Sequence, residues 1–490
     1  MDSVRVRIAP SPSGFLHIGT AKMALFNWLV ARHTGGAFIL RLEDTDAERT
    51  DEAFVHAMCE GFQWLGIDWD EGPAFGDEPE KGAYGPYRQS QRKELHQREA
   101  HRLLAEGKAY KCFLTKEELE EERNRCRAES RPLRSKWRDA TPEEVATMGD
   151  TPFAVRFRVP EGETVINDLV QGEVRINHNQ IDDFVILKPN GDPIFHLAVV
   201  VDDGTMKITH VIRGDDHLTN TPRHVMLFEA LGYPVPAFAH LPMVLDERGK
   251  KYSKRDRGAN VLDWRDDGYL AEALINYVVL LGWSPGDDRV LFSRDELVNE
   301  VTIDRFGQSA ARFDLKKLQW LNGQHIRLLS PEDLCDRLTP ILETAGFDLS
   351  ERSRDWLLQM TLICQEKLAT LNDIVEQTDF FFVAPTEYEE KAVKKHWQKD
   401  DAAIILEQLL AAVANVEPWS HDDLKEAFKK LAENAGVGLG QLIHPTRLAL
   451  TGKSVGPGLF ELAELLGKDV CVNRMERALA YVRDLQESAS

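Results

Sequence analysis

The segment RIAPSPSGFLHIGT, residues 7–20, places two prolines, two glycines and a histidine between an apolar run and a helical pattern. Before it, Val4, Val6 and Ile8 alternate with arginines, which predicts a β-strand. After it, apolar residues recur at helical spacing, and the sequence HTGG at 33–36 predicts the end of the helix. The chain therefore passes from strand to helix through a loop in which Gly14 and Gly19 allow a ligand to approach the backbone.

This alternation continues and indicates an α/β fold. Residues 37–44, AFILRLED, predict a second strand, and an amphipathic helix follows it. Further sheet-like segments are IFHLAVVVDD at 194–203, MKITHVIRG at 206–214 and HLPMVL at 240–245. We expect a doubly wound, Rossmann-like parallel sheet split between residues 1–75 and 190–250. Two further regions are an inserted α+β lobe at 76–189 and all-α domains at 326–490, joined to the sheet domain by residues 251–325.

Composition describes a globular chain with several domains. The 490 residues contain six scattered cysteines, as in reduced cytosolic proteins, and lack an apolar run long enough to span a bilayer. The N-terminal residues have no signal-peptide core, so we expect a cytoplasmic protein. A net charge of -21 argues against a nucleic-acid partner. Two basic islands, residues 123–138 and 391–399, leave that partner open, since each is either a contact surface or a solvated helix face.

Charged residues gather where the predicted strands end. Arg7, Glu43 and Arg213 each end a sheet-like segment, and KKYSKR at 250–255 follows another. Ligands of wound sheets bind outside the carboxyl ends of the strands. Two arginines with an acidic group suit a zwitterion that carries an extra carboxylate. The alternatives are that Arg7 faces water on an edge strand and that Asp44 and Asp46 cap a helix, a role that suits Asp46 better.

A helix beginning near His17 directs its N–H groups and the positive end of its dipole toward the same edge. A histidine there can donate to phosphate oxygens as negative charge develops in a transition state. The lysines of residues 250–255 can follow a leaving pyrophosphate. Either motif alone is weak, whereas the pair, both at strand ends, predicts chemistry on nucleotide phosphates.

These motifs resemble the HIGH and KMSKS signatures of class I aminoacyl-tRNA synthetases, as HIGT at 17–20 and KYSKR at 251–255. Three longer stretches resemble bacterial glutamyl-tRNA synthetases: APSPSGFLHIGTA at 9–21, RLEDTDAERT at 41–50 and HVIRGDDHLTNTPRH at 210–224. TGKSVGPGLFELAELLGK at 451–468 extends the resemblance to the C-terminal third, so that it covers essentially the whole chain.

The resemblance implies an ATP-dependent, AMP-forming glutamate–tRNA ligase. L-Glutamate and ATP, with Mg²⁺, would give glutamyl-adenylate and pyrophosphate, and glutamate would then pass to the 3′-terminal ribose of tRNA(Glu). Residues 76–189 would bind the tRNA acceptor end, 251–325 would carry the lysine loop, and 326–490 would read the anticodon. The implied glutamate-binding residues are Arg7, Ala9, Ser11, Glu43, Phe195 and Arg213. The implied ATP-binding residues are Gly14, His17, Gly19, Asp216 and Lys254, and the catalytic ones His17, Gly19, Lys251 and Lys254. We expect a monomer without a membrane partner.

Two departures from the family pattern concern metal and substrate. Cys112 is followed by Phe113 and Leu114, and Cys126 has no neighbouring cysteine or histidine, so we predict no zinc and no other protein metal site. Phe195 stands where many relatives have a tyrosine that contacts substrate. It is either a plain core residue or a changed substrate contact.

Other functions remain as alternatives. The enzyme could charge tRNA(Gln) as well as, or instead of, tRNA(Glu). A tRNA-modifying glutamyl transferase would lack the helical last third. A non-catalytic paralogue that binds tRNA would have lost His17, Gly19 or Lys254, and all three are present. A small-molecule nucleotidyltransferase would share only the first motif.

Overall fold

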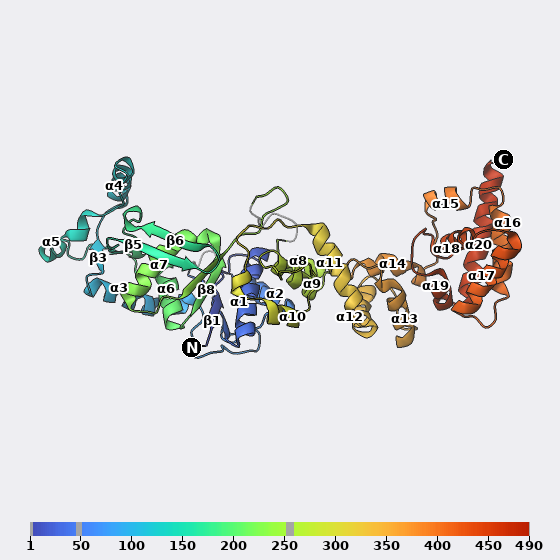
Figure 1. Cartoon of the computed structure of the whole chain (residues 1–490), viewed down its shortest axis with the longest axis horizontal. Helices are drawn as coiled ribbons and strands as arrows, with labels where there is room; N and C mark the ends of the chain where they lie inside the picture. The colour runs from blue at the N-terminus through green and yellow to red at the C-terminus, as the bar shows by residue number, and fades with distance from the viewer. Residues whose placement is uncertain (1–2, 46–50, 251–258, 490) are drawn as a thin grey trace. The chain divides into compact units, whose positions relative to one another are not determined.

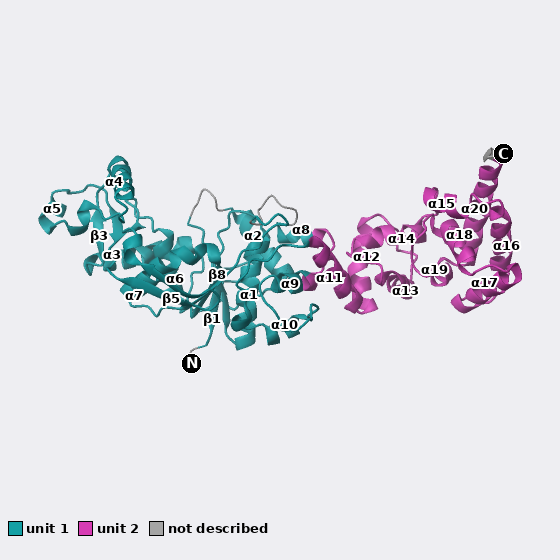
Figure 2. Ribbon diagram, turned by 45° about the horizontal axis from the view of Figure 1, so that its top comes forward, with its two compact units in different colours: residues 1–264, 274–314 teal, residues 265–273, 315–490 magenta. Residues whose placement is uncertain are grey.

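The computed structural model describes residues 3–45, 51–250 and 259–489. The chain divides into two compact units, residues 1–264 with 274–314 and residues 265–273 with 315–490 (Figure 2). The first unit contains the described β-strands together with helices, and the second is helical (Figure 1). The predicted α/β class with helical C-terminal domains is confirmed. Within the described ranges, no helix combines the length and apolar character needed to cross a membrane.

The centre of the first unit is built from parallel strand pairs. β1 (Arg5–Ile8) pairs with β2 (Ala37–Leu40), and β8 (His210–Gly214) pairs with β9 (Ala237–Leu241). The Thr209 amide, directly before β8, donates to the Arg5 carbonyl at 2.9 Å and so joins the two pairs. The carboxyl ends of β1, β2 and β8 carry Arg7, Glu43 and Arg213, as the sequence predicts.

The helix between β1 and β2 begins and ends where predicted. α1 (Ile18–Thr34) has His17 as its N-cap, and Gly35 closes it in the left-handed region at φ 63°. Most of its apolar residues are buried, and so are Lys22 and Asn27. After β2, α2 (Glu52–Trp64) begins at Asp51, whose side chain accepts from the Ala53 amide. Asp51 thus has the capping role considered for Asp44 and Asp46. Asp44 instead accepts from the Ser90 amide and hydroxyl, and Asp46 lies outside the described residues.

One predicted strand is wrong. Residues Phe195–Thr205 form helix α6, although IFHLAVVVDD has the composition of a buried strand. Residues 197–203 are all buried, so the helix shows no polar face that would reveal its period. The error matters, because α6 places Phe195 in its first turn and Asp203 two turns later.

The inserted region is α+β, as predicted. β3 (Ala109–Cys112), β4 (Ala154–Phe157) and β7 (Val185–Leu187) form an antiparallel sheet. β5 (Glu163–Asp168) and β6 (Gly172–Asn177) form a hairpin beside β9. The other helices of the first unit are α3 (Lys93–Ala105), α4 (Lys116–Ala128), α5 (Pro142–Ala146), α7 (Thr221–Leu231) and α10 (Arg294–Glu300). Short 3-10 turns are Gln89–Arg92, Lys136–Asp139, His178–Gln180, Asp215–Asn220 and Ile303–Arg305.

The second unit packs its helices around a continuous apolar core that includes Leu338, Trp397 and Phe428. The chain passes from one unit to the other within α8 (Val261–Asp266), within α9 (Ala271–Leu280) and again between residues 314 and 315. The helices that follow are α11 (Leu315–Leu328), α12 (Pro331–Thr344), α13 (Arg354–Gln365), α14 (Asp373–Phe382), α15 (Glu390–His396), α16 (Ala402–Ala414), α17 (His421–Ala435), α18 (Gly440–Thr451), α19 (Leu459–Leu466) and α20 (Lys468–Ala489).

Candidate active site

A cavity of about 520 Å³ opens at the carboxyl ends of β1 and β8. Five of the six residues predicted for glutamate line it: Arg7, Ala9, Glu43, Phe195 and Arg213. Three of those predicted for ATP, His17, Gly19 and Asp216, line it as well. Ser11 and Gly14 are not among its lining residues. Lys251 and Lys254 lie outside the described residues, so their predicted roles stay predictions.

His17 caps α1 from the cavity wall. Its backbone is extended, and its Nδ1 accepts the Gly19 amide at 3.0 Å. This contact places the proton of the neutral ring on Nε2. A Cβ at position 19 would lie 3.2 Å from Nδ1, which explains why glycine suits that position.

The chain that follows the lysine segment is fixed beside His17. The Ile18 amide donates to the Ala259 carbonyl at 3.0 Å, and the Val261 amide donates to the Leu16 carbonyl at 2.9 Å. The described chain therefore resumes at Ala259, beside the N-terminal end of α1.

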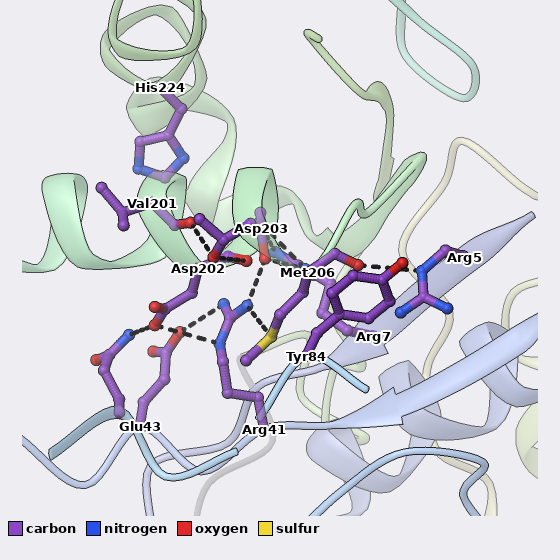
Figure 3. A network of polar contacts seen from close by, with 12 residues as sticks. Arg5, Arg7, Arg41, Glu43, Tyr84, Val201, Asp202, Asp203, Met206 and His224 are labelled. Carbon is purple, nitrogen blue, oxygen red and sulfur yellow. Dashed lines mark hydrogen bonds and ion pairs between the residues drawn. The ribbon is translucent and has the colours of Figure 1, made fainter. Parts of the chain in front are cut away.

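Arg7 is held by an aspartate from α6 rather than by water. Its guanidinium reaches Asp203 through Nε and Nη2, at 3.1 Å each (Figure 3). Arg41 contacts the same carboxylate through Nη1 at 2.6 Å. Burial opposes ionisation of Asp203, but the two guanidinium groups lower its pKa below the ordinary value. The alternative in which Arg7 faces solvent on an edge strand is wrong, since its side chain is 5% exposed.

The neighbouring Asp202 anchors the inserted region to this network. Its Oδ1 accepts from Arg92 Nε at 2.6 Å and lies 2.8 Å from His96 Nε2. Its Oδ2 accepts from Gln89 at 2.9 Å. Although burial opposes it, these partners keep the pKa of Asp202 low. The paired aspartates therefore join β1, β2 and the chain before α3 through buried charges.

Among the residues predicted for glutamate, Glu43 is the acidic one, and it lines the cavity. Its Oε1 lies 3.4 Å from Arg41 Nη2. Burial raises the pKa of Glu43, and the guanidinium groups of Arg41 and Arg7 oppose that rise. A ligand ammonium group beside Glu43 would favour its ionised form.

Arg213 is a buried cation surrounded by neutral acceptors. It donates to His240 Nε2 at 3.1 Å, to Thr221 Oγ1 at 2.8 Å and to His224 Nδ1 at 3.3 Å. Among the residues that the structure describes, no carboxylate forms an ion pair with it. Burial, reinforced by the charge of Arg7, lowers the pKa of Arg213 to about 9. The position favours an anionic ligand, because a carboxylate would supply the opposite charge.

Phe195 forms part of the cavity wall. Its side chain is 36% exposed and lies against the rings of His196, His217 and His224. This excludes a plain core role. Burial lowers the pKa of His196 to about 4, with the charges of Arg223 and Arg213 acting in the same direction. The cluster is therefore neutral at physiological pH.

Lys22 was missed by sequence reasoning. It lines the cavity from the apolar face of α1, where its Nζ donates to the Pro242 carbonyl at 2.9 Å. Burial lowers its pKa to about 8. A lysine on an otherwise apolar helix face was the available signal. Asp203 had none, since it lies about 200 positions from its partner Arg7 and reads as the end of a strand.

The basic island 123–138 is extensively paired. Six of its seven basic residues contact carboxylates: Arg123, Arg125, Arg131, Arg134, Lys136 and Arg138. Arg134 and Arg138 hold the fully buried Asp183 and are structural. The ion pairs of the other four residues lie at the surface, where such pairs contribute little to stability.

Metal ligands do not gather in the described parts of the chain, where no group of three or more His, Cys, Asp or Glu side chains could hold an ion. Cys112 lies 3.6 Å from the Ser135 hydroxyl, and Cys126 contacts Glu122 and Arg131. The absence of zinc stays a prediction.

Comparison with known proteins matches both parts of the chain. Residues 3–320 match the family tRNA synthetases class I (E and Q), catalytic domain, and residues 333–479 match an anticodon binding domain. A glutamate–tRNA ligase of Moorella thermoacetica is 43% identical over 497 residues, covering 99% of both chains. The glutamate–tRNA ligase of Geobacter sulfurreducens is also 43% identical, covering 98% of this chain and 100% of its own.

Solved structures show the same similarity in three dimensions. A glutamate–tRNA ligase from Elizabethkingia meningosepticum, crystallised in complex with its amino acid, superposes with a TM-score of 0.89 at 35% identity. It covers 98% of this chain and 99% of its own. Glutamate–tRNA synthetase from Elizabethkingia anophelis gives 0.86 at 35% identity, covering 98% of this chain and all of its own.

Proposed function

The chain belongs to the glutamate–tRNA ligases of the class I (E and Q) family, and we propose that it joins L-glutamate to tRNA(Glu) at the expense of ATP. One observation in the structure carries the proposal. A single cavity joins a buried guanidinium that lacks an ion-pair partner among the described residues to the histidine-capped start of a long helix. The first feature favours a carboxylate and the second favours phosphate.

The amino acid is assigned to the side of the cavity formed by Arg213, Arg7 and Glu43. A carboxylate of glutamate gives Arg213 its counter-charge, and Glu43 faces the ammonium group. Ala9 and Phe195 form the adjoining wall. Glutamine would present a neutral amide to one of these arginines. With glutamine bound, the charge of that arginine would stay buried without a counter-charge. This cost discriminates strongly against glutamine, so glutamate is favoured.

ATP is assigned to the side formed by His17, Gly19 and Asp216. The positive end of the α1 dipole and the Nε2 proton of His17 are assigned to phosphate oxygens. Lys251 and Lys254 remain the predicted groups for the α-phosphate and the leaving pyrophosphate. Magnesium enters with the nucleotide, because Mg²⁺ is commonly held by substrate phosphates together with one or two carboxylates.

The first step forms one bond and breaks one. A carboxylate oxygen of glutamate attacks the α-phosphorus of ATP in line, and the bond to the β-phosphate oxygen breaks, releasing pyrophosphate. The enzyme supplies position and positive charge rather than a proton acceptor. In the second step a ribose hydroxyl at the 3′ end of tRNA attacks the glutamyl carbonyl. AMP leaves with the electron pair of the anhydride bond, and one of its phosphate oxygens takes up the hydroxyl proton.

The remaining regions are assigned to tRNA. We place the acceptor end on residues 76–189, the lysine loop in 251–325 and anticodon recognition in 326–490. The match of residues 333–479 to an anticodon binding domain supports the last assignment. The same match is the observation against a tRNA-modifying transferase restricted to the catalytic domain. A cytoplasmic monomer is the proposed working form.

The test is charging of purified tRNA(Glu) and tRNA(Gln) transcripts with labelled glutamate, with labelled glutamine as control. Stable glutamyl-tRNA(Glu) alone supports the proposal in full. Glutamyl-tRNA on both transcripts, or on tRNA(Gln) only, replaces it with the broader or redirected charging activity. Absence of any charged product contradicts the ligase assignment.

A further inference from the structure

Arg213 owes its position to a chain of buried side chains that the cavity does not include. Its Nε donates to His240 Nε2 at 3.1 Å, and the strand register places these two residues directly opposite each other on β8 and β9. Its Nη2 donates to the Thr221 hydroxyl at 2.8 Å, and that hydroxyl lies 3.1 Å from the same His240 nitrogen. His240 Nε2 is therefore the shared hydrogen-bond partner of the Arg213 guanidinium and the Thr221 hydroxyl.

Asp168 fixes the state of that histidine. Its Oδ2 lies 2.5 Å from His240 Nδ1, while Oδ1 accepts the amides of His240, Val170 and Gln171 at 3.1, 3.0 and 2.8 Å. An ionised carboxylate only accepts hydrogen bonds, so Nδ1 must carry the ring proton and Nε2 must present a lone pair to Arg213. Asp168 and His240 are 4% and 0% exposed, so water does not compete for these contacts.

This series of buried side chains begins in the inserted lobe. Asp168 ends β5, the first strand of the hairpin, and the next residue, Leu169, donates its amide to the Phe238 carbonyl on β9 at 2.8 Å. The Gln171 side chain donates to the His240 carbonyl at 2.9 Å. The hairpin is therefore bound to β9 by a backbone and a side-chain hydrogen bond from the residues that directly follow Asp168.

We infer that Asp168 is a positioning residue that acts through His240 on Arg213 and so sets the affinity of the cavity for its carboxylate substrate. The inference rests on the proposed function, in which Arg213 binds a carboxylate of glutamate. A guanidinium binds a carboxylate well only when its planar fork is correctly turned. If Asp168 loses its charge, His240 can carry its proton on Nε2, where it opposes the Nε–H of Arg213, and the fork loses its fixed orientation.

The first experiment compares Asp168→Asn with Asp183→Asn. Asp183 is a matched control, since it is a fully buried aspartate of the same lobe that accepts several hydrogen bonds without contacting Arg213. Calorimetric titration of the full-length protein gives the Kd for glutamate, and tRNA charging gives KM values for glutamate and ATP. For Asp168→Asn we expect the Kd and KM for glutamate to rise about tenfold or more, with the KM for ATP within about twofold.

Other results overturn the inference: a parallel rise in both KM values, an unchanged Kd for glutamate, or the same glutamate-selective loss in Asp183→Asn. If the wild-type protein binds glutamate but charges no tRNA, the proposed function fails while the binding comparison still decides on Asp168. If the wild-type protein binds no glutamate, both fail.

Two substitutions of His240 test the same relay without changing Asp168, so that a folding defect of Asp168→Asn does not decide the result. A glutamine oxygen can occupy the place of Nε2 and still accept from Arg213, whereas an asparagine reaches only the place of Nδ1. We expect His240→Gln to bind glutamate within about threefold of wild type and His240→Asn to lose about tenfold or more. In the His240→Gln background, adding Asp168→Asn should have little further effect on the Kd. Equal losses in the two His240 variants, or full additivity, contradict a relay through this nitrogen.

Discussion

Replacing Arg213 with glutamine tests whether its positive charge is needed to bind a ligand or to stabilise the fold. Arg213 is 8% exposed and has only neutral partners among the described residues, and burial lowers its pKa to about 9. Its charge is therefore unfavourable in the absence of an anion, on the order of a few kcal/mol by the usual relation of pKa to free energy. The lost hydrogen bonds to Thr221 and His240 offset this by about 1 kcal/mol each.

We therefore expect Arg213→Gln to leave the free energy of unfolding unchanged or to raise it by up to about 2 kcal/mol. Glutamate at about 100 times its Kd should stabilise the wild-type protein by about 2.7 kcal/mol, whereas the variant should gain almost nothing. Hydrogen exchange of peptides from β8 and β9 in increasing urea measures the free energy of unfolding of these strands and its increase on adding glutamate.

Arg92→Gln is the matched control. Arg92 is equally buried, at 4% exposure, but its Nε donates to the Asp202 carboxylate at 2.6 Å. Breaking that pair should lower the free energy of unfolding by about 3–5 kcal/mol. The account of Arg213 is refuted if its glutamine variant is destabilised as strongly as Arg92→Gln, or if it retains the stabilisation by glutamate.

Three more predictions concern two buried charged groups and one glycine in close contact with its neighbour. Asp203→Asn should lower the free energy of unfolding by about 3–5 kcal/mol. A carboxylate with a lowered pKa loses its stabilising effect only as the pH falls below the ordinary pKa of 3.8. The difference in free energy of unfolding between wild type and variant, measured in urea, should therefore be constant between about pH 7 and pH 5. The pKa of Lys22 is lowered to about 8, so the unfolded chain binds more protons between that value and 10.5. The stability of wild type relative to Lys22→Met should therefore rise by up to about 1.4 kcal/mol per pH unit in that window, and a flat difference would contradict the assignment. Gly36→Ala should lower the free energy of unfolding by about 1–3 kcal/mol, because its Cβ would lie 2.2 Å from the Val4 carbonyl oxygen. Thermal unfolding measures this, and an unchanged Tm would show that the backbone between β1 and β2 can move to make room.

The sequence predicted the parts of the site that depend on local pattern. Alternation before residue 10 and helical spacing after residue 17 placed β1 and α1, and Gly35 ended the helix. The convergence of Arg7, Glu43 and Arg213 followed from one rule, because the carboxyl ends of neighbouring parallel strands meet at one edge.

The parts that were not predicted depend on contacts between distant segments. Residues 195–205 looked like a strand because a helix buried on every side has no polar face. Asp203 and Asp168 could not be matched to Arg7 and His240, since only the folded chain brings each pair together. The cation–carboxylate network of the site is therefore a property of the tertiary structure.

The most direct measurement of the central claim is ATP–pyrophosphate exchange with glutamate, with and without tRNA(Glu), and with glutamine in place of glutamate. The account predicts exchange that requires glutamate, is absent with glutamine, and falls strongly in Arg213→Gln. Exchange with glutamine at a similar rate, or undiminished exchange in Arg213→Gln, would contradict the assignment of this cavity to a carboxylate substrate.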